Sequence, residues 1–295
     1  MKKADNFQKF ELRYKDVLVK KIMNLSFLPS RSDWNEIKLG LTKKAGNAAW
    51  KEFKTKYIEY VLFKIFVQKK NKDKYFIQSV IKDNSILEDL ANLKSKFELK
   101  SGLHAKDVKL SKYPQLNKFC KTAYLTEVRK RYRGVFSVNS HIRLALNDSK
   151  ENFWDERYSE GKTNFHFDQQ FNSFTMIIYL STVTENDAPF SIIPKSLKTK
   201  ENIPLALFDR AITDQLGLDS HICSDRSGYY YDFKDDDISR ITGSLGSYAM
   251  FGGRGILHDG GFPKAGGHRI AIFIDQRNWL MNLINKISIV LGKII

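Results

Sequence analysis

The sequence of 295 residues predicts an α+β fold, in which a mainly β core has helices added before and after it. Residues 48–69 are rich in apolar and aromatic side chains at spacings typical of a helix packed on at least one face. Residues 135–146 alternate with a period of two instead, as a strand with one buried face does. Apolar, β-branched and aromatic runs typical of buried strands follow at 174–180, 246–251 and 269–274.

The part before residue 134 is expected to be mostly helical. The segments at 33–36 and 85–88 both fit a capping box, the side-chain pairing that starts a helix. Residues 116–128 carry an apolar stripe at helical spacing, and Gly134 suits the turn that ends such a helix. We therefore predict that residues 1–133 form a helical extension packed on the core.

The β core is expected over residues 134–279, and residues 280–295 are expected to form an amphipathic helix. Apolar residues recur there at helical spacing, and the polar side carries only Lys286 and Lys293. Such a stripe could pack on the domain, pair with a second subunit or lie in a membrane interface. Packing on the domain or on a partner is favoured, so a homo-oligomer through this helix is one expectation.

The positive charge is concentrated before the β core. Residues 1–133 carry 32 Lys and Arg against 14 Asp and Glu, whereas residues 134–295 carry 17 against 19. This asymmetry can mark a surface for a polyanion, such as nucleic acid, anionic lipid, an acidic carrier protein or a phosphorylated substrate. A generally solvated surface is the favoured alternative, and helix-dipole interactions explain cations at the end of a helix, as at 129–133.

Composition predicts a cytoplasmic protein. Cys120 and Cys223 are the only cysteines and form no metal-binding spacing, so a disulfide scaffold is not expected. The first residues lack the apolar core of a secretion signal. No apolar stretch reaches the length needed to span a bilayer.

A set of polar residues beside the predicted strands indicates a metal site. His166 and Asp168 are two residues apart, so on a strand both side chains point to the same face. With His258 from a later strand they form the two-histidine, one-carboxylate set that holds iron(II) and leaves three positions open. Arg269 opens the last strand-like run, and its guanidinium suits a carboxylate of a co-substrate.

The segment from about residue 164 to 274 resembles the phytanoyl-CoA dioxygenase family of iron(II)/2-oxoglutarate oxygenases. The resemblance rests on these four residues, the strand ending in Tyr179-Leu180, the stretch 188–196 and Gly246-Ser247. The family usually has a Pro-Gly-Ser-His turn where this chain has the sequence PKSL at 194–197. The carboxylate of Asp168 distinguishes the chain from halogenating relatives, which bind chloride in that place.

The resemblance implies a double-stranded β-helix of the jelly-roll or cupin type, with iron(II) held by His166, Asp168 and His258. It implies that 2-oxoglutarate and O₂ are co-substrates, with the distal carboxylate of 2-oxoglutarate on Arg269. Oxidative decarboxylation to succinate and CO₂ would then accompany hydroxylation of a C–H bond in a small-molecule, sugar, lipid or carrier-bound metabolite. On the strand at 135–146, His141 and Arg143 are expected to contact the co-substrate or the substrate, with exposure to water as the alternative.

Two alternatives come from other classes of protein. A nucleic-acid-binding or nucleic-acid-modifying protein would use the basic part before residue 134 and would bind with a steep salt dependence. A non-catalytic cupin-like binding protein would hold a structural metal or none. The positive extension mildly favours an anionic substrate or carrier.

Overall fold

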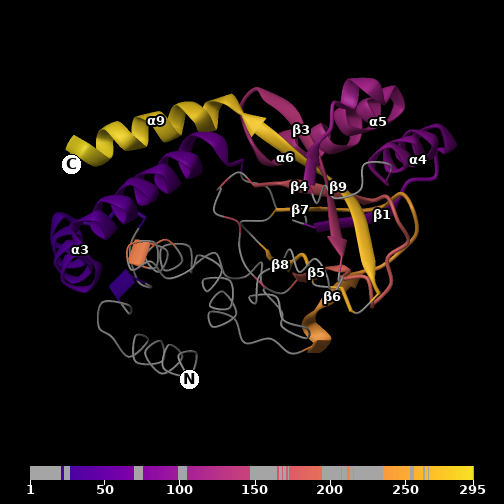
Figure 1. Cartoon of the computed structure of the whole chain (residues 1–295). Helices are drawn as coiled ribbons and strands as arrows, with labels where there is room; N and C mark the ends of the chain where they lie inside the picture. The colour runs from indigo at the N-terminus through magenta and orange to yellow at the C-terminus, as the bar shows by residue number, and fades with distance from the viewer. Residues whose placement is uncertain are drawn as a thin grey trace. The chain divides into compact units, whose positions relative to one another are not determined.

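The computed structural model describes residues 21–22, 27–69, 76–98, 105–146, 165, 168, 171, 173–194, 207, 211–212, 215, 235–252, 256–261, 263–264 and 266–294. The chain forms two compact units, one of them mainly helical and the other built around two β-sheets (Figure 1). The first unit spans residues 1–65, 198–223 and 283–295, and the second spans 66–197 and 224–282.

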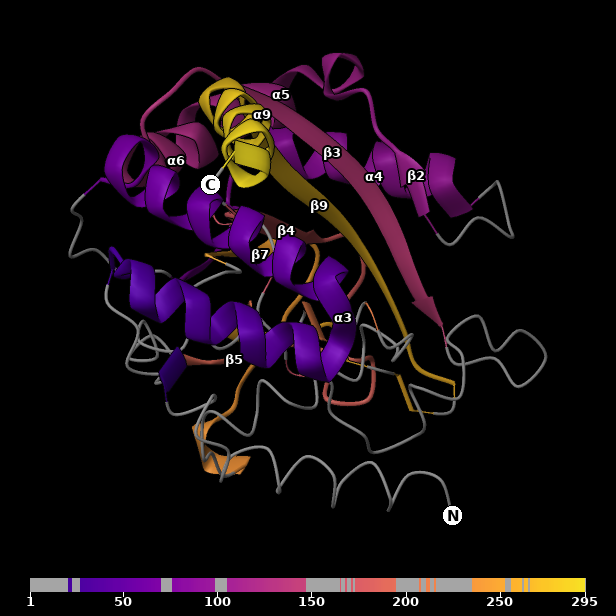
Figure 2. The ribbon, with the colours of Figure 1, turned by 90° about the vertical axis from the view of Figure 1, so that its left-hand side faces the viewer.

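The first unit contains the long helix α3 (Arg31–Leu62), which continues into a π-helical turn, η1 (Phe63–Val67). The helix begins with a capping box between Ser30 and Asp33, so its start lies slightly before the predicted box at 33–36. At Gly46 the backbone adopts φ 84° and ψ 172°, a left-handed conformation that favours glycine. The helix therefore bends there, and its two arms lie side by side (Figure 2).

Aromatic rings join the two arms of α3. The ring of Trp34 lies 5.4 Å from that of Trp50 and 5.4 Å from that of Tyr57, both edge to face. The C-terminal helix α9 (Trp279–Ile294) approaches the second arm closely, because a Cβ atom added at Gly292 would come 2.5 Å from Thr55 Oγ1. The apolar stripe predicted for 48–69 is therefore largely core, but Ile65 and Phe66 at its end are exposed.

The second unit contains a six-stranded antiparallel sheet and a three-stranded antiparallel sheet. In spatial order the strands of the large sheet are β1 (Phe76–Val80), β7 (Ser247–Phe251), β4 (Thr175–Tyr179), β9 (His268–Asn278), β3 (Phe136–Leu146) and β2 (Ala105–Asp107). Those of the small sheet are β6 (Ser239–Ile241), β5 (Phe190–Ile193) and β8 (Leu257–Asp259). The four strands predicted at 135–146, 174–180, 246–251 and 269–274 are thereby confirmed.

The two sheets face each other across an apolar core. Its buried members come from both sheets and from the connections between them: Ile177, Tyr179, Val183, Phe190, Ile192, Ile241, Ala249, Phe251, Ile256 and Ala271. Tyr179 also joins the sheets by hydrogen bonds, because its hydroxyl donates to the Ile241 carbonyl at 2.6 Å and accepts from the Phe190 N–H at 3.0 Å. The inner face of the large sheet is thus the wall of an enclosed interior.

Short helices of the second unit cover the outer face of the large sheet (Figures 1 and 2). They are α4 (Asn84–Glu98), η2 (Leu110–Lys112), α5 (Pro114–Phe119), η3 (Cys120–Tyr124) and α6 (Leu125–Arg131). The ring of Phe119 lies 5.6 Å from that of Tyr248, on β7, and the hydroxyl of Tyr124 donates to the Phe174 carbonyl. The helix predicted to continue to Gly134 ends at Arg131 instead.

The dense cationic run at 129–133 is partly built into the fold. Arg131 is only 4% exposed, its Nη1 donates to Glu127 Oε2 at 2.6 Å, and its guanidinium lies 4.5 Å from the ring centre of Phe174. Lys130 also pairs with Glu127. Burial raises the pKa of Glu127, but the hydrogen bonds from Lys130 and Arg131 outweigh this, and the pKa is lowered.

Replacing Arg131 with alanine is expected to lower the free energy of unfolding by about 2–4 kcal/mol, because the change breaks a largely buried ion pair. Arg129→Ala removes an exposed cation of the same helix and is expected to change stability by less than about 0.5 kcal/mol. Urea unfolding of both variants measures the difference. Equal stability of the two would show that the buried pair contributes nothing.

One side of α9 carries exposed apolar side chains, among them Leu283, Val290 and Ile294. In the part of the chain that the structure describes, no helix combines the length and the apolar character that crossing a membrane requires.

Candidate active site

His258 enters the interior from the small sheet. It lies on β8 directly opposite Ile192 of β5, and it is 5% exposed. Its ring lies 4.9 Å from the ring of Phe251 on the large sheet and 5.7 Å from that of Phe190. A histidine predicted to bind metal is therefore held by rigid apolar neighbours between the two sheets.

Asp168 meets His258 in this interior. Its Oδ1 atom lies 3.4 Å from His258 Nε2, and its Oδ2 atom accepts a hydrogen bond from the Ser173 hydroxyl. Phe165, which is three residues earlier, packs instead with Ile193 and Leu257 in a separate apolar cluster.

The other ring nitrogen of His258 fixes the orientation of the imidazole. Nδ1 lies 3.0 Å from the carbonyl oxygen of Ile256, which calls for a proton on Nδ1, and Nε2 faces Oδ1 of Asp168. Burial lowers the pKa of His258, but the charge of Asp168 and hydrogen bonding outweigh it, so that the pKa is raised. The carboxylate thus attracts a positive charge to this point.

The two side chains fit a metal ion. Ligands in adjacent positions on one metal, each about 2.1 Å from it, lie about 3 Å apart, close to the separation of Asp168 and His258. A carbonyl on the far nitrogen of a metal-binding histidine is the usual supporting contact. His166, the third predicted ligand, lies outside the described residues. Within the described residues, His, Cys, Asp and Glu form no group of three or more that could hold a metal ion.

Arg269 is buried on the same inner face of the large sheet and is 6% exposed. Its Nη1 donates to the carbonyl oxygens of Ala188 and Gly260, which come from two different connections. Ala188 has φ 58°, a left-handed conformation unusual for alanine, and this backbone presents its carbonyl to the guanidinium. Burial lowers the pKa of Arg269, although arginine stays charged at neutral pH.

The donors of Arg269 are only partly used. Nε and Nη2 have no hydrogen-bond partner in the described part of the chain, whereas Nη1 has two. A guanidinium with one such edge left over can bind a carboxylate through two parallel hydrogen bonds. This is the chemistry predicted for Arg269 from the sequence.

His141 and Arg143 share this inner face. In the antiparallel pairing of β3 with β9, Arg143 lies opposite Ala271 and His141 opposite Phe273, while Arg269 lies opposite Ala145. Opposite residues and those two apart on one strand are on the same side of a sheet. His141 is partly buried and Arg143 is exposed, and contact of either residue with a co-substrate or substrate stays a prediction.

Three polar residues near these side chains were not predicted. Thr175 Oγ1 donates to Asp275 Oδ1 at 2.6 Å, which fixes a carboxylate on the inner face, and Ser173 holds Asp168. Thr175 and Asp275 are directly opposite in the pairing of β4 with β9. The two residues are a hundred positions apart in the sequence. Their contact depends on the register of β4 against β9, which cannot be predicted from the sequence.

The fold is that of a double-stranded β-helix with added helices: two antiparallel sheets face each other, and helices cover the outer face of the larger one. The fold class predicted from the sequence is therefore confirmed. The two facing sheets agree with the fold that the resemblance to phytanoyl-CoA dioxygenase-like enzymes implies.

Comparison with solved structures finds several to which this chain is similar. The chain is similar to the non-heme alpha ketoglutarate dependent epimerase SnoN from nogalamycin biosynthesis, with 10% identity and a TM-score of 0.42 over 70% of this chain and 78% of that one. It is similar to iron-bound EctD from S. alaskensis, with 12% identity and a TM-score of 0.43 over 70% of this chain and 73% of that one. It is also similar to HygX from Streptomyces hygroscopicus with nickel and 2-oxoglutarate bound. The identity is 11% and the TM-score is 0.41, over 69% of this chain and 82% of that one. No protein-family model and no curated protein matches the sequence.

Proposed function

We propose that this protein is a non-haem iron(II)/2-oxoglutarate-dependent dioxygenase that hydroxylates a C–H bond of a small-molecule or carrier-bound metabolite. The observation that carries the proposal is the convergence of Asp168 Oδ1 and His258 Nε2, 3.4 Å apart, in an interior that also contains the buried cation Arg269. His166 is proposed as the third ligand because the sequence places it two residues before Asp168.

The proposed roles follow from the surroundings of each side chain. Asp168 and His258 would hold the metal, and Ser173 and the Ile256 carbonyl would keep them in place. Arg269 would bind the distal carboxylate of 2-oxoglutarate through the donors that the two carbonyls leave over. When bound, iron couples the reduction of O₂ and the decarboxylation of 2-oxoglutarate to oxidation of the substrate.

The protein contributes largely apolar surroundings for His258 and Arg269, which are 5% and 6% exposed, while the side chain of Asp168 is 30% exposed. Phe190 and Phe251 flank His258, and Tyr179 is fully occupied in joining the two sheets beside Arg269. Electrostatic attraction between Arg269 and a carboxylate is stronger in such surroundings than in water. The rings also limit the access of water to the metal, which favours oxidation of the bound substrate over side reactions.

An anaerobic titration of the metal-free protein with iron(II) and 2-oxoglutarate tests this proposal. We expect the visible metal-to-ligand charge-transfer band of the ternary complex to develop and saturate at one equivalent of iron. The band should be absent when 2-oxoglutarate is replaced by succinate, which cannot chelate through a keto acid. A folded protein that binds iron and gives no band would contradict the proposal and favour a non-catalytic binding protein.

A further inference from the structure

A second polar cluster lies on the inner face of the large sheet, beside the proposed metal and co-substrate sites. It consists of His141 and Arg143 on β3, with Phe273 and Asp275 on β9. The imidazole of His141 stacks on the ring of Phe273, with the ring centres 5.4 Å apart and the planes 10° apart. The guanidinium of Arg143 lies 4.9 Å from the centre of the same ring. One aromatic side chain therefore positions both polar groups.

Burial and the charges of Arg143 and Asp275 act on the protonation of His141. Thr175 fixes one oxygen of this carboxylate, and the other oxygen lies 3.9 Å from His141 Nδ1. Burial and the charge of Arg143 lower the pKa of His141, so its imidazole is neutral at pH 7. The nearby carboxylate favours the tautomer with its proton on Nδ1, which leaves Nε2 as an acceptor.

The Nε2 atom of His141 is buried and has no hydrogen-bond partner in the described part of the chain. A buried acceptor without a partner is costly in free energy, and in a native structure it calls for an explanation. A donor group supplied by a ligand would satisfy this acceptor.

Arg143 forms no direct ion pair among the described residues, although burial raises the pKa of Asp275 and the charge of Arg143 acts to lower it. No carboxylate lies within ion-pair distance of its guanidinium in the part of the chain that the structure describes, and its charge contributes to lowering the pKa of Arg269. In the proposed function, Arg269 takes the distal carboxylate of 2-oxoglutarate and the metal takes the other end. Both anionic ends of the co-substrate are then occupied, while Arg143, unlike Arg269, is exposed and can receive an anion from solvent.

We propose that Arg143 and His141 bind the anionic end of the substrate, which carries a carboxylate, sulfonate or phosphate group next to a hydroxyl or amine. Arg143 pairs with the anion, and His141 Nε2 accepts a hydrogen bond from the neighbouring hydroxyl or amine. This inference rests on the proposed function, and it narrows the substrate to a small polar anion. A neutral lipid would leave both the charge and the buried acceptor without a partner.

Small sulfonates test this site without competing for iron. The protein is loaded anaerobically with iron(II) and 2-oxoglutarate and titrated by calorimetry with ethanesulfonate, with isethionate, which adds a hydroxyl, and with neutral dimethyl sulfone. We expect isethionate to bind about tenfold or more tightly than ethanesulfonate, because the hydroxyl meets a buried acceptor. Dimethyl sulfone is expected not to bind.

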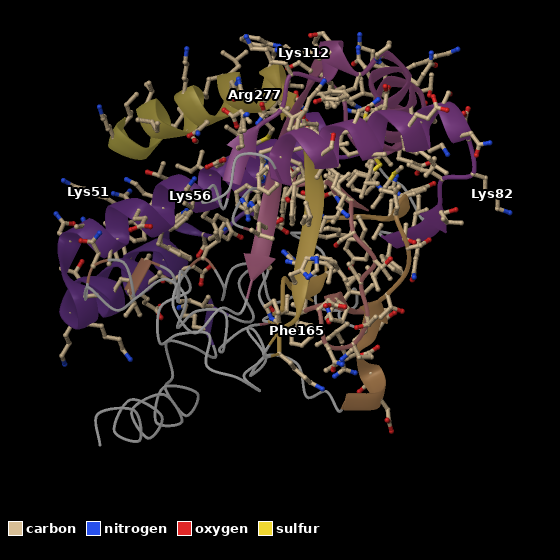
Figure 3. The ribbon with its side chains drawn as sticks, turned by 45° about the vertical axis from the view of Figure 1, so that its right-hand side comes forward. Lys51, Lys56, Lys82, Lys112, Phe165 and Arg277 are labelled. Atoms are coloured by element: carbon tan, nitrogen blue, oxygen red, sulfur yellow. The ribbon has the colours of Figure 1, made fainter. Side chains whose placement is uncertain are left out.

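Variants show which residue binds the anion and which accepts the hydrogen bond from the hydroxyl. Arg143→Gln should abolish binding of both sulfonates, and Arg143→Lys should restore part of it. His141→Phe should remove only the advantage of isethionate. Arg277→Gln is the matched control, because this exposed arginine is also on β9 but lies away from the cluster. It is six residues, about 20 Å, along the strand from Ala271, the residue opposite Arg143, and Figure 3 shows it far from Phe165.

The charge-transfer band, followed in parallel, separates this inference from the proposed function. An intact band with no sulfonate binding to the wild type would overturn the anion site alone. A sulfonate that displaces 2-oxoglutarate and bleaches the band would also overturn it, because Arg143 would then serve the co-substrate. Sulfonate binding that Arg143→Gln does not weaken would show that another cation is responsible.

Discussion

Replacing His258 with alanine is expected to abolish 2-oxoglutarate turnover. The loss should go well beyond the roughly 10–100-fold cost of removing a group that only orients a ligand, because a metal ligand itself is lost. The side chain is buried between two aromatic rings and lies 3.4 Å from Asp168, so no solvent-exposed group can move easily into its place. Succinate formation and the iron content of the purified variant measure the effect.

Ser173→Ala is the matched control for this prediction. It removes the hydroxyl that donates to Asp168 and leaves both proposed ligands in place, so we expect turnover to fall by roughly 10–100-fold without complete loss. Unfolding curves of both variants show whether the fold is retained. A folded His258→Ala protein with wild-type turnover would exclude His258 as a ligand.

Replacing Arg269 with alanine is expected to raise the KM for 2-oxoglutarate by about 30-fold or more. The reason is that removing one partner of a buried, hydrogen-bonded charge pair costs roughly 2–5 kcal/mol of binding free energy. Iron binding should persist, since Arg269 donates to the carbonyls of Ala188 and Gly260 and to no proposed ligand. Turnover measured against 2-oxoglutarate concentration separates this effect on KM from an effect on kcat.

Arg269→Lys provides the comparison for this prediction. Lysine keeps the charge but lacks the two-pronged guanidinium, so its KM should fall between those of the wild type and the alanine variant. Because both changes also remove the links to two carbonyls, the free energy of unfolding should be measured beside the kinetics. An unchanged KM in Arg269→Ala would show that a different cation holds the co-substrate.

The strands that could be predicted from the sequence are those with strongly apolar or alternating side chains. In β4 all five residues are buried, and in β3 the period-two pattern matches the observed pairing with β9. The strand β1 was not predicted, because its side chains are half-buried or exposed and give no such pattern. Hydrophobic periodicity reports burial, so it fails where a strand is weakly buried.

Helix starts were predicted only approximately, because several polar residues compete for each cap. At α3 the capping residue is Ser30, and Asp33 fills the reciprocal position, whereas the prediction began the box at Asp33. At α4, Asp83 accepts hydrogen bonds from the backbone and the hydroxyl of Ser85. The three-dimensional path of the preceding chain decides between such candidates, and a local sequence pattern does not contain it.

For the site, the chemistry of single residues was visible in the sequence but their partners were not. His258 and Arg269 were singled out as functional side chains within strand-like runs, and the structure buries both. The contact of His141 with Asp275 depends on the register of β3 against β9, across more than a hundred residues. The empty acceptor on His141 also depends on that register, which is why its role became apparent only from the structure.

The exposed strand β1 has a consequence for handling the protein. It pairs with β7 on one side, and among the described residues no further strand pairs with it on the other side. Its sequence, FIQSV, contains no charge and no proline, the two features that usually prevent such an edge from pairing with another chain. An edge of this kind is a place where aggregation can begin in concentrated solutions. A lysine at Gln78 or Ser79, both exposed, would protect it with little effect on the interior.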